Sequence, residues 1–320
     1  MRIVFRGQVF EAELTELARR RKLDFLVARD EDELLRALPG ADALWITPTY
    51  YSPAVPQAVK AEPGRLKWIG LTSAGYDVLL RAGVPPGVTM TYAVTVHGPA
   101  VAEHAVALVL ALVRQLPRAL AAQPEGAWNA PAMIGTLRSL EDLTVAIVGF
   151  GSIGGELAAR LRPLAKRIVG VSRSGRPDAR ADAMFASAQL HDALAQSDVA
   201  ILTVTYSPET KHLIDAAALG AMPAGALLVN VSRGPVVDGA ALHAALVEKR
   251  LGGAALDVTD PEPLPPADPL WTTPGVIVTP HIGSFGSIAT GTRLADQYER
   301  NIARFERGEA LEGTIVLPTL

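Results

Sequence analysis

The chain has 320 residues, a length that predicts two domains at about 150 residues per domain. Its composition is 49% hydrophobic and 20% charged, which is typical of a globular protein and excludes an intrinsically disordered one. The 30 basic and 33 acidic residues leave a net charge of −3 with neutral histidines. This balance gives no overall charge that favours nucleic acid or an anionic membrane surface.

The sequence contains no cysteine, which excludes disulfides, thiolate metal sites, iron–sulfur clusters and cysteine nucleophiles. The first ten residues, MRIVFRGQVF, lack the apolar core of a signal peptide. The longest apolar run, Ala105–Val113, is too short to span a bilayer. We therefore expect a soluble, cytoplasmic protein without a metal site.

Strand-like and helix-like segments alternate from the first residue. Asp30 has the residue type of a helix N-cap, with Glu33 three residues later, and predicts a helix that runs through Leu38. Another helix is expected over Glu11–Arg20. Strands are expected at Arg2–Phe5, Leu23–Ala28, Ala43–Thr47, Leu66–Leu71 and Val88–Tyr92. Strands that alternate with helices predict a parallel sheet.

A long helix, Val101–Leu116, is apolar on most of its surface, which predicts burial between domains or subunits. A loop over 123–135 follows, and Ser287–Arg307 predicts one amphipathic helix near the C-terminus. Between them a second alternating series has predicted strands at Thr144–Val148, Arg167–Ser172, Val199–Thr203, Ala226–Val231, Gly253–Val258 and Val276–Thr279.

The strand at Thr144–Val148 leads directly into GFGSIG, in which Gly149, Gly151 and Gly154 have the G-x-G-x-x-G spacing. The first glycine permits a tight turn, the second a close approach of backbone to a pyrophosphate, and the third close helix–strand packing. The N-terminus of the helix predicted over Ser152–Leu161 offers amides to the phosphates. An ordinary strand–helix turn is the alternative, but the flanking elements favour dinucleotide binding.

The next predicted strand ends at Ser172, where NAD-binding proteins usually carry an acid that binds the ribose 2′-hydroxyl. Arg173 and Arg176 follow this serine. Serine and arginine can bind a 2′-phosphate that an acid would repel, so the sequence predicts NADP as the preferred cofactor, with NAD possible. In the alternative interpretation Arg173 is a solvated surface residue or stacks on adenine.

Several further motifs occur in order along nearly the whole chain: LTSAGYD (Leu71–Asp77), HGPAVAEHAVALVLALVR (His97–Arg114), Trp128, ETKHLID (Glu209–Asp215), NVSRG, ALDV, DPEPL and TPHIG. Together with the glycine motif they resemble the D-isomer-specific 2-hydroxyacid dehydrogenases, most of all the glyoxylate and hydroxypyruvate reductases. We expect two doubly wound parallel-sheet α/β domains with the active site in the cleft between them. A flavodoxin-like substrate domain would comprise residues 1–93 plus 287–320, and a Rossmann cofactor domain residues 94–286.

The resemblance implies that Arg233 binds the substrate and that Glu262 and His281 form the acid–base pair. Reduction of a 2-keto acid needs a hydride at C2 and a proton at the carbonyl oxygen. A guanidinium forms paired bonds to carboxylate and carbonyl oxygens, and histidine is a suitable proton donor near neutral pH. An adjacent carboxylate would orient the imidazole ring. Alternatively, each of these side chains is an ordinary turn or loop residue without a catalytic role.

The resemblance also implies the remaining contacts. Backbone amides around Ala74 and Gly75 would bind the substrate carboxylate, and Asp257 would hold the nicotinamide carboxamide. The expected cofactor-binding residues are Gly149, Gly151, Ser152, Ile153, Gly154, Ser172, Arg173, Ser174, Thr205, Val231, Ser232, Asp257, His281 and Gly283. A homodimer is expected from the apolar helix and the likeness together.

The sequence says less about which substrate is used than about the type of reaction. Trp45, Tyr50, Tyr51 and Tyr76 are candidates for the walls of a pocket, although core packing explains each of them equally well. We expect hydride transfer between NAD(P)H and a small 2-keto acid or D-2-hydroxy acid, with glyoxylate or hydroxypyruvate first. The alternatives are another enzyme class on the same cofactor fold and a catalytically silent NAD(P)-sensing binding protein.

Overall fold

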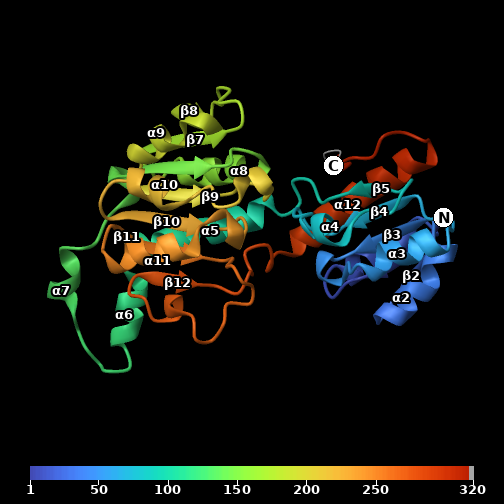
Figure 1. Cartoon of the computed structure of the whole chain (residues 1–320), viewed down its shortest axis with the longest axis horizontal. Helices are drawn as coiled ribbons and strands as arrows, with labels where there is room; N and C mark the ends of the chain where they lie inside the picture. The colour runs from blue at the N-terminus through green and yellow to red at the C-terminus, as the bar shows by residue number, and fades with distance from the viewer. Residues whose placement is uncertain (317–320) are drawn as a thin grey trace. The chain divides into compact units, whose positions relative to one another are not determined.

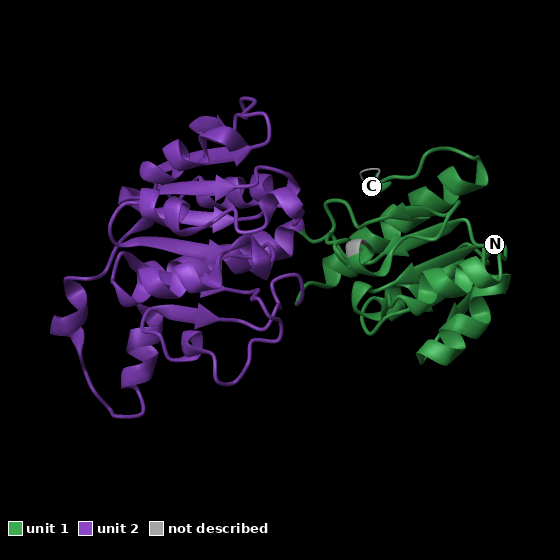
Figure 2. Cartoon of the chain, in the orientation of Figure 1, with its two compact units in different colours: residues 1–97, 286–320 green, residues 98–285 purple. Residues whose placement is uncertain are grey.

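The computed structural model describes residues 1–316, without the side chain of Leu80, and divides into two compact units (Figure 2). Unit 1 comprises Met1–His97 with Gly286–Leu320, and unit 2 comprises Gly98–Phe285. Each unit has its own sheet, and every strand pair in both sheets is parallel. The α/β class and the two parallel sheets are those predicted from the sequence.

Unit 1 contains a five-stranded sheet of order β2-β1-β3-β4-β5, the flavodoxin-like order (Figure 1). Its last helix, α12, comes from the C-terminal part of the chain, so the unit is discontinuous. The elements are β1 Arg2–Arg6, α1 Glu11–Arg20, β2 Asp24–Val27, α2 Glu31–Ala37, β3 Ala43–Ile46, α3 Ala54–Ala61, β4 Trp68–Leu71, α4 Val78–Ala82, β5 Thr89–Thr91 and α12 Ile288–Glu306.

Aromatic side chains form part of the core of unit 1. Trp45, Trp68 and Tyr298 are fully buried, with the rings of Trp45 and Tyr298 4.5 Å apart between centroids. Tyr51 is only 2% exposed and donates a hydrogen bond to the Gly83 carbonyl. Core packing, one of the two interpretations open for Trp45 and Tyr51, is therefore what the structure shows for this pair.

Unit 2 contains a seven-stranded sheet of order β12-β11-β10-β9-β6-β7-β8. The direction of winding reverses beside β6, between β6 and β9, as in dinucleotide-binding folds. The elements are α5 Gly98–Val113, α6 Leu116–Ala122, α7 Ala130–Ile134, β6 Thr144–Val148, α8 Ser152–Leu161, β7 Arg167–Ser172, β8 Ala183–Ala186, α9 Leu190–Ala195, β9 Val199–Leu202, α10 Ala216–Ala221, β10 Ala226–Asn230, α11 Gly239–Val247, β11 Leu251–Leu256 and β12 Val276–Val278.

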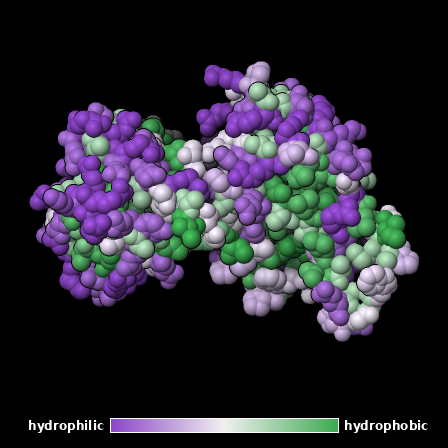
Figure 3. Space-filling view, turned by 180° about the vertical axis from the view of Figure 1, so that it is seen from behind, coloured by the Kyte–Doolittle hydropathy of each residue, from purple (hydrophilic) through white to green (hydrophobic). Residues whose placement is uncertain are grey.

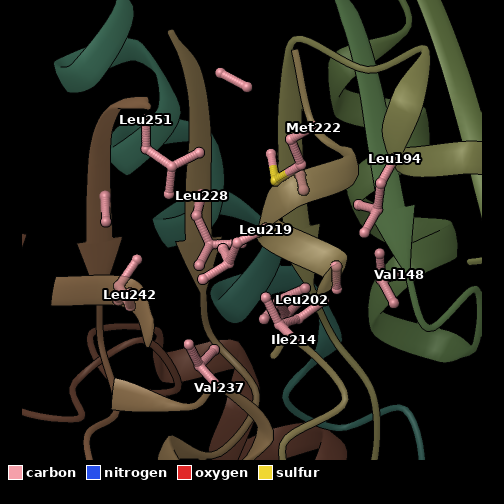
Figure 4. Packing of buried hydrophobic residues seen from close by; sticks show 14 of the residues in the cluster. Val148, Leu194, Leu202, Ile214, Leu219, Met222, Leu228, Val237, Leu242 and Leu251 are labelled. Carbon is pink, nitrogen blue, oxygen red and sulfur yellow. The ribbon is translucent and has the colours of Figure 1, made fainter. Parts of the chain in front are cut away.

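The core of unit 2 is almost entirely aliphatic and consists of two clusters, one on each side of the sheet. One cluster joins the sheet to α9, α10 and α11, and the other joins it to α5 and α8. Figure 4 shows the first cluster, in which Leu219 of α10 lies against Leu228 of β10. Because both faces of a parallel sheet are covered, its strands are continuous apolar runs, which is why the sequence revealed most of them.

Asp30 is confirmed as an N-cap, since its carboxylate accepts a hydrogen bond of 2.7 Å from the Glu33 amide. The long apolar helix differs from its prediction, because α5 ends at Val113 and α6 begins at Leu116 after Gln115 at φ 52°. Pro117 has no N–H for the helical bond back to residue 113, which explains the break. The segment 123–135, expected as a loop, contains α7.

Within residues 1–316, no single helix is long and apolar enough to cross a membrane. α5 and α6 satisfy that test of length and composition only as a pair, bent by 64° at the break between them. The same residues contain no group of three or more histidines, aspartates and glutamates that could hold a metal ion.

Candidate active site

The glycine turn connects β6 to α8 at the point where the winding of the sheet reverses. Gly149 has φ 103°, and a Cβ there would lie 2.6 Å from the Val204 amide nitrogen after β9. A Cβ on Gly154 would collide with the Gly149 carbonyl. At Gly151 nothing lies within 4 Å of an added Cβ, so protein packing does not explain this glycine. Open space beside Gly151 at the helix N-terminus fits the close approach of a pyrophosphate.

The end of β7 carries the residues expected at the ribose. The Ser172 hydroxyl accepts a hydrogen bond of 3.1 Å from the Gly175 amide, which closes the turn. Arg173, Ser174 and Arg176 are exposed. Arg173 also lies close enough to Glu209 to contribute, after the hydrogen bond from Ser207, to lowering the pKa of that carboxyl. The tip of β7 therefore offers a hydroxyl and two guanidiniums to a ligand, with one acid nearby.

Arg233 stands at a tight turn after β10. The buried Asn230 side chain donates to the Arg233 carbonyl at 2.9 Å and accepts from the Ser232 amide and hydroxyl. One Arg233 guanidinium nitrogen donates to the Ser232 carbonyl at 2.7 Å. A Cβ on Gly234 would collide with the Thr259 carbonyl. The Arg233 turn is therefore pressed against the chain segment that leads to Glu262.

Glu262 and His281 are in direct contact, with 2.6 Å between the carboxylate Oε1 and the imidazole Nδ1. Both side chains are about two-fifths exposed, at 42% and 40%. His281 has φ 53°, in the left-handed region, and its amide donates to the Asp257 carbonyl at 2.8 Å. A carboxylate on Nδ1 leaves Nε2 as the nitrogen that can exchange a proton with a ligand.

Asp257 lies at the end of β11 and is 4% exposed. Its Oδ1 accepts from the Thr279 hydroxyl at 2.6 Å and the Ile282 amide at 3.0 Å, and its Oδ2 accepts from the Gly283 amide at 2.9 Å. His104 Nε2 of α5 is 3.2 Å from Oδ1. Burial raises the pKa of Asp257, but the hydrogen bonds from His104, Thr279, Gly283 and Ile282 outweigh it and lower the value to about 2.

A cavity of about 550 Å³ lies beside the Arg233 turn, between α11 and the chain over 258–270. Asn230, Gly234 and Leu264 are among the residues that line it, but Arg233, Glu262 and His281 are not. This cavity is therefore not a pocket formed by the catalytic candidates.

Comparison with known proteins identifies the family. The NAD-binding domain of D-isomer specific 2-hydroxyacid dehydrogenases matches residues 106–283. The chain belongs to this family. Its members are nicotinamide-dependent oxidoreductases acting on the CH–OH group of 2-hydroxy acids, and that reaction class applies to this chain.

Relatives in the family carry different names. A glyoxylate reductase/hydroxypyruvate reductase of Mus musculus is 32% identical over 260 residues, which cover 80% of this chain and 79% of that protein. A D-3-phosphoglycerate dehydrogenase of Mycobacterium tuberculosis is 34% identical over 278 residues, 86% of this chain and 52% of that protein. The solved structure of a family member from Xanthobacter autotrophicus Py2, in complex with NADPH and MES, has a TM-score of 0.84, 28% identity and 98% coverage of both chains.

The predicted site residues fall into both units. The candidate catalytic and cofactor-binding residues all belong to unit 2. They lie at the ends of its strands, in the loops that follow and, for Ser152, Ile153 and Gly154, in the first turn of α8. Of these, Thr205 lies after β9, and Val231 and Ser232 are buried after β10. Ala74 and Gly75 belong to unit 1, where the Ser73 hydroxyl donates to the Gly75 carbonyl at 2.7 Å.

Sequence reasoning missed three side chains that support the site: Asn230, Thr279 and His104. Asn230 and Thr279 are the first polar residues at the carboxyl ends of apolar strand segments, a position that could have marked them. Nothing in the sequence marked His104 as part of the site, because the residues around it have the pattern of an apolar helix.

Proposed function

We propose that the protein reduces a small 2-keto acid to the D-2-hydroxy acid with NADPH, with glyoxylate and hydroxypyruvate as the first candidate substrates. The observation that carries this proposal is the 2.6 Å pair of Glu262 and His281, in a unit that also contains the Arg233 turn and the glycine turn of a dinucleotide site. A carboxylate, an imidazole and a guanidinium are the groups that this reduction needs.

In the proposed reaction the reduced nicotinamide, when bound, supplies a hydride to C2 of the keto acid. Arg233 binds the carboxylate and carbonyl oxygens and stabilises the negative charge that develops on the carbonyl oxygen. His281 gives a proton from Nε2 to that oxygen, while Glu262 on Nδ1 fixes the orientation of the ring. The backbone amides of Ala74 and Gly75 would anchor the substrate carboxylate, and Asp257 would hold the nicotinamide carboxamide.

The substrate and cofactor proposals have separate support. Relatives named glyoxylate reductase from several organisms are 32–34% identical to this chain, which favours a small keto acid. Ser172, Arg173 and Arg176 at the tip of β7 favour NADPH, as does the NADPH complex of the Xanthobacter structure. The proposed cofactor-binding set is the one expected from the sequence, centred on Gly149–Gly154.

A panel of glyoxylate, hydroxypyruvate and branched 2-keto acids, each assayed with NADPH and with NADH, tests the proposal through the loss of nicotinamide absorbance. Arg233→Ala is the matched variant, and its kcat/KM is expected to fall by about 10²–10⁴. A clear preference for NADH would refute the cofactor proposal. Tight cofactor binding with no turnover of any keto acid would favour the NAD(P)-sensing alternative.

The exposed apolar surface of unit 2 supports a homodimer. Figure 3 shows apolar residues gathered on the face of this unit that is seen from behind. Large apolar side chains that are at least a third exposed recur along α5–α7 and their connections: Leu110, Leu116, Leu120, Trp128 and Ile134. We expect analytical ultracentrifugation at micromolar concentration to give a dimer, and Leu120→Asp to shift it towards monomer. A monomeric parent protein would refute the homodimer.

A further inference from the structure

His104 is the residue whose position the proposed function does not explain. It projects from α5, 20% exposed, with Nε2 3.2 Å from Asp257 Oδ1 and 3.1 Å from the Thr279 hydroxyl. We propose that His104 is a positioning residue for His281, acting through the Asp257 carboxylate and Thr279. The inference rests on the proposed function, because it assigns His104 a part in placing the proton donor of that reaction.

Asp257 holds the His281 loop at three consecutive amides. Its carbonyl accepts from the His281 amide at 2.8 Å, and its carboxylate accepts from the Ile282 and Gly283 amides at 3.0 and 2.9 Å. His281 itself has φ 53°, a conformation that is unfavourable for most non-glycine residues and persists where the surroundings fix it. The direction of the imidazole therefore depends on how firmly the Asp257 carboxylate is held.

Two donors fix that carboxylate from the other side. The Thr279 hydroxyl donates to Oδ1 at 2.6 Å, and His104 Nε2 reaches both Oδ1 and the Thr279 oxygen. The hydrogen bonds lower the pKa of Asp257 to about 2, so the carboxylate is ionised near neutral pH and can only accept. Nε2 of His104 must then carry the hydrogen and act as the donor.

The part of α5 that carries His104 is packed into the core of unit 2. Its neighbours on α5, Ala105, Leu108 and Val109, are buried in the aliphatic cluster that joins α5 and α8 to the sheet. The space around the contact is full as well, since a Cβ on Gly283 would lie 2.9 Å from Asp257 Oδ2 and 3.0 Å from His104 Cδ2. The position of α5 thus determines where the His104 imidazole lies. The imidazole in turn holds the Asp257 carboxylate, which binds the loop of His281.

Two amide variants form a matched pair. The side-chain nitrogen of Gln can stand where Nε2 stands, whereas that of Asn is too short to reach. We expect His104→Gln to keep kcat within about threefold of the parent and His104→Asn to lower it about ten- to a hundredfold, with a smaller change in the Kd for NADPH. Amide hydrogen exchange at Ile282 and Gly283 should be about tenfold faster in His104→Asn than in His104→Gln.

Leu108→Ala is the control for destabilisation of α5, because Leu108 is buried on the same helix and lies outside the site. It should lower the melting temperature and leave kcat near that of the parent. Equal kcat and equal exchange in the Gln and Asn variants would overturn the inference, as would a Leu108→Ala variant that lost activity as His104→Asn does. If the parent reduces no keto acid, the proposed function fails, and the exchange rates still decide whether His104 holds the loop.

Discussion

Asp257 and its hydrogen-bonding partners form a corner at the carboxyl end of β11. This corner and the tip of β7, residues 172–176, lie at the carboxyl ends of strands in the same parallel sheet and are built in opposite ways. Asp257 is 4% exposed, and the donors around it engage both of its carboxylate oxygens. At the tip of β7, Arg173, Ser174 and Arg176 are exposed, and Ser172 accepts one bond from Gly175. A proton donor needs a fixed position, whereas a surface tip can change which cofactor it prefers at little cost to folding.

The largest effect is expected at the end of the rigid corner. His281→Asn keeps a residue type that tolerates a positive φ but removes the proton donor. We expect kcat/KM for the keto acid to fall by about 10²–10⁴, with little change in melting temperature. Steady-state kinetics and a thermal melt of the same preparations check this. Activity within tenfold of the parent would remove His281 from the proposed mechanism.

Asp257→Asn tests whether the corner is held by charge. The pKa of this carboxyl is lowered from 3.8 to about 2, so the ionised form stabilises the fold above about pH 4, and this contribution is lost as the pH falls towards 2. The shift corresponds to about 2 kcal/mol of unfolding free energy. Urea unfolding should show a difference between parent and variant that is full at pH 6 and shrinks below pH 4. A difference independent of pH would contradict the charge argument.

At the exposed tip, Arg173→Ala should change selectivity without changing stability. Loss of one charge-assisted hydrogen bond to a 2′-phosphate is expected to lower the ratio of kcat/KM for NADPH to that for NADH about tenfold or more. The melting temperature should stay the same, because Arg173 is exposed. An unchanged ratio would mean that Arg173 does not contact the cofactor phosphate.

Glu209→Gln should move the same ratio in the other direction. The hydrogen bond from Ser207 is the main cause of the lowered pKa of Glu209, and the charge of the nearby Arg173 guanidinium also contributes to it. The carboxylate of Glu209 therefore offsets part of the charge of Arg173. We expect the preference for NADPH to rise about two- to threefold, a small effect because both groups are solvated. Parallel assays with the two cofactors measure it, and a fall in the ratio would contradict the proposed charge balance.

The smallest effect is expected in the other unit, in the aromatic core of unit 1. The Tyr298 hydroxyl is buried, and no side chain or backbone group within residues 1–316 forms a hydrogen bond with it. Tyr298→Phe should therefore leave the free energy of unfolding unchanged or raise it by up to about 1 kcal/mol. Chemical denaturation checks this, and a clear loss of stability would show that the hydroxyl has a partner.

Much of the fold could be predicted from local patterns. Strands that are buried on both faces appear in the sequence as continuous apolar segments. Asp30, together with Glu33, marked the start of α2. β8 was not predicted, because Ala183–Ala186 is a four-residue, half-buried edge strand without a β-branched residue, although all four of its residues are apolar. The break between α5 and α6 was also missed, although Pro117 was visible in the sequence.

The sequence by itself determined the glycine turn, the order of the segments and the residue types at the strand ends, because these depend on near neighbours in the chain and on periodicity. The family follows from the same ordered motifs. Only the tertiary structure decided that an imidazole of α5 meets the carboxylate at the end of β11, and that this carboxylate holds the loop of His281. Contacts between distant segments depend on how helices cross the sheet, which no spacing along the chain records.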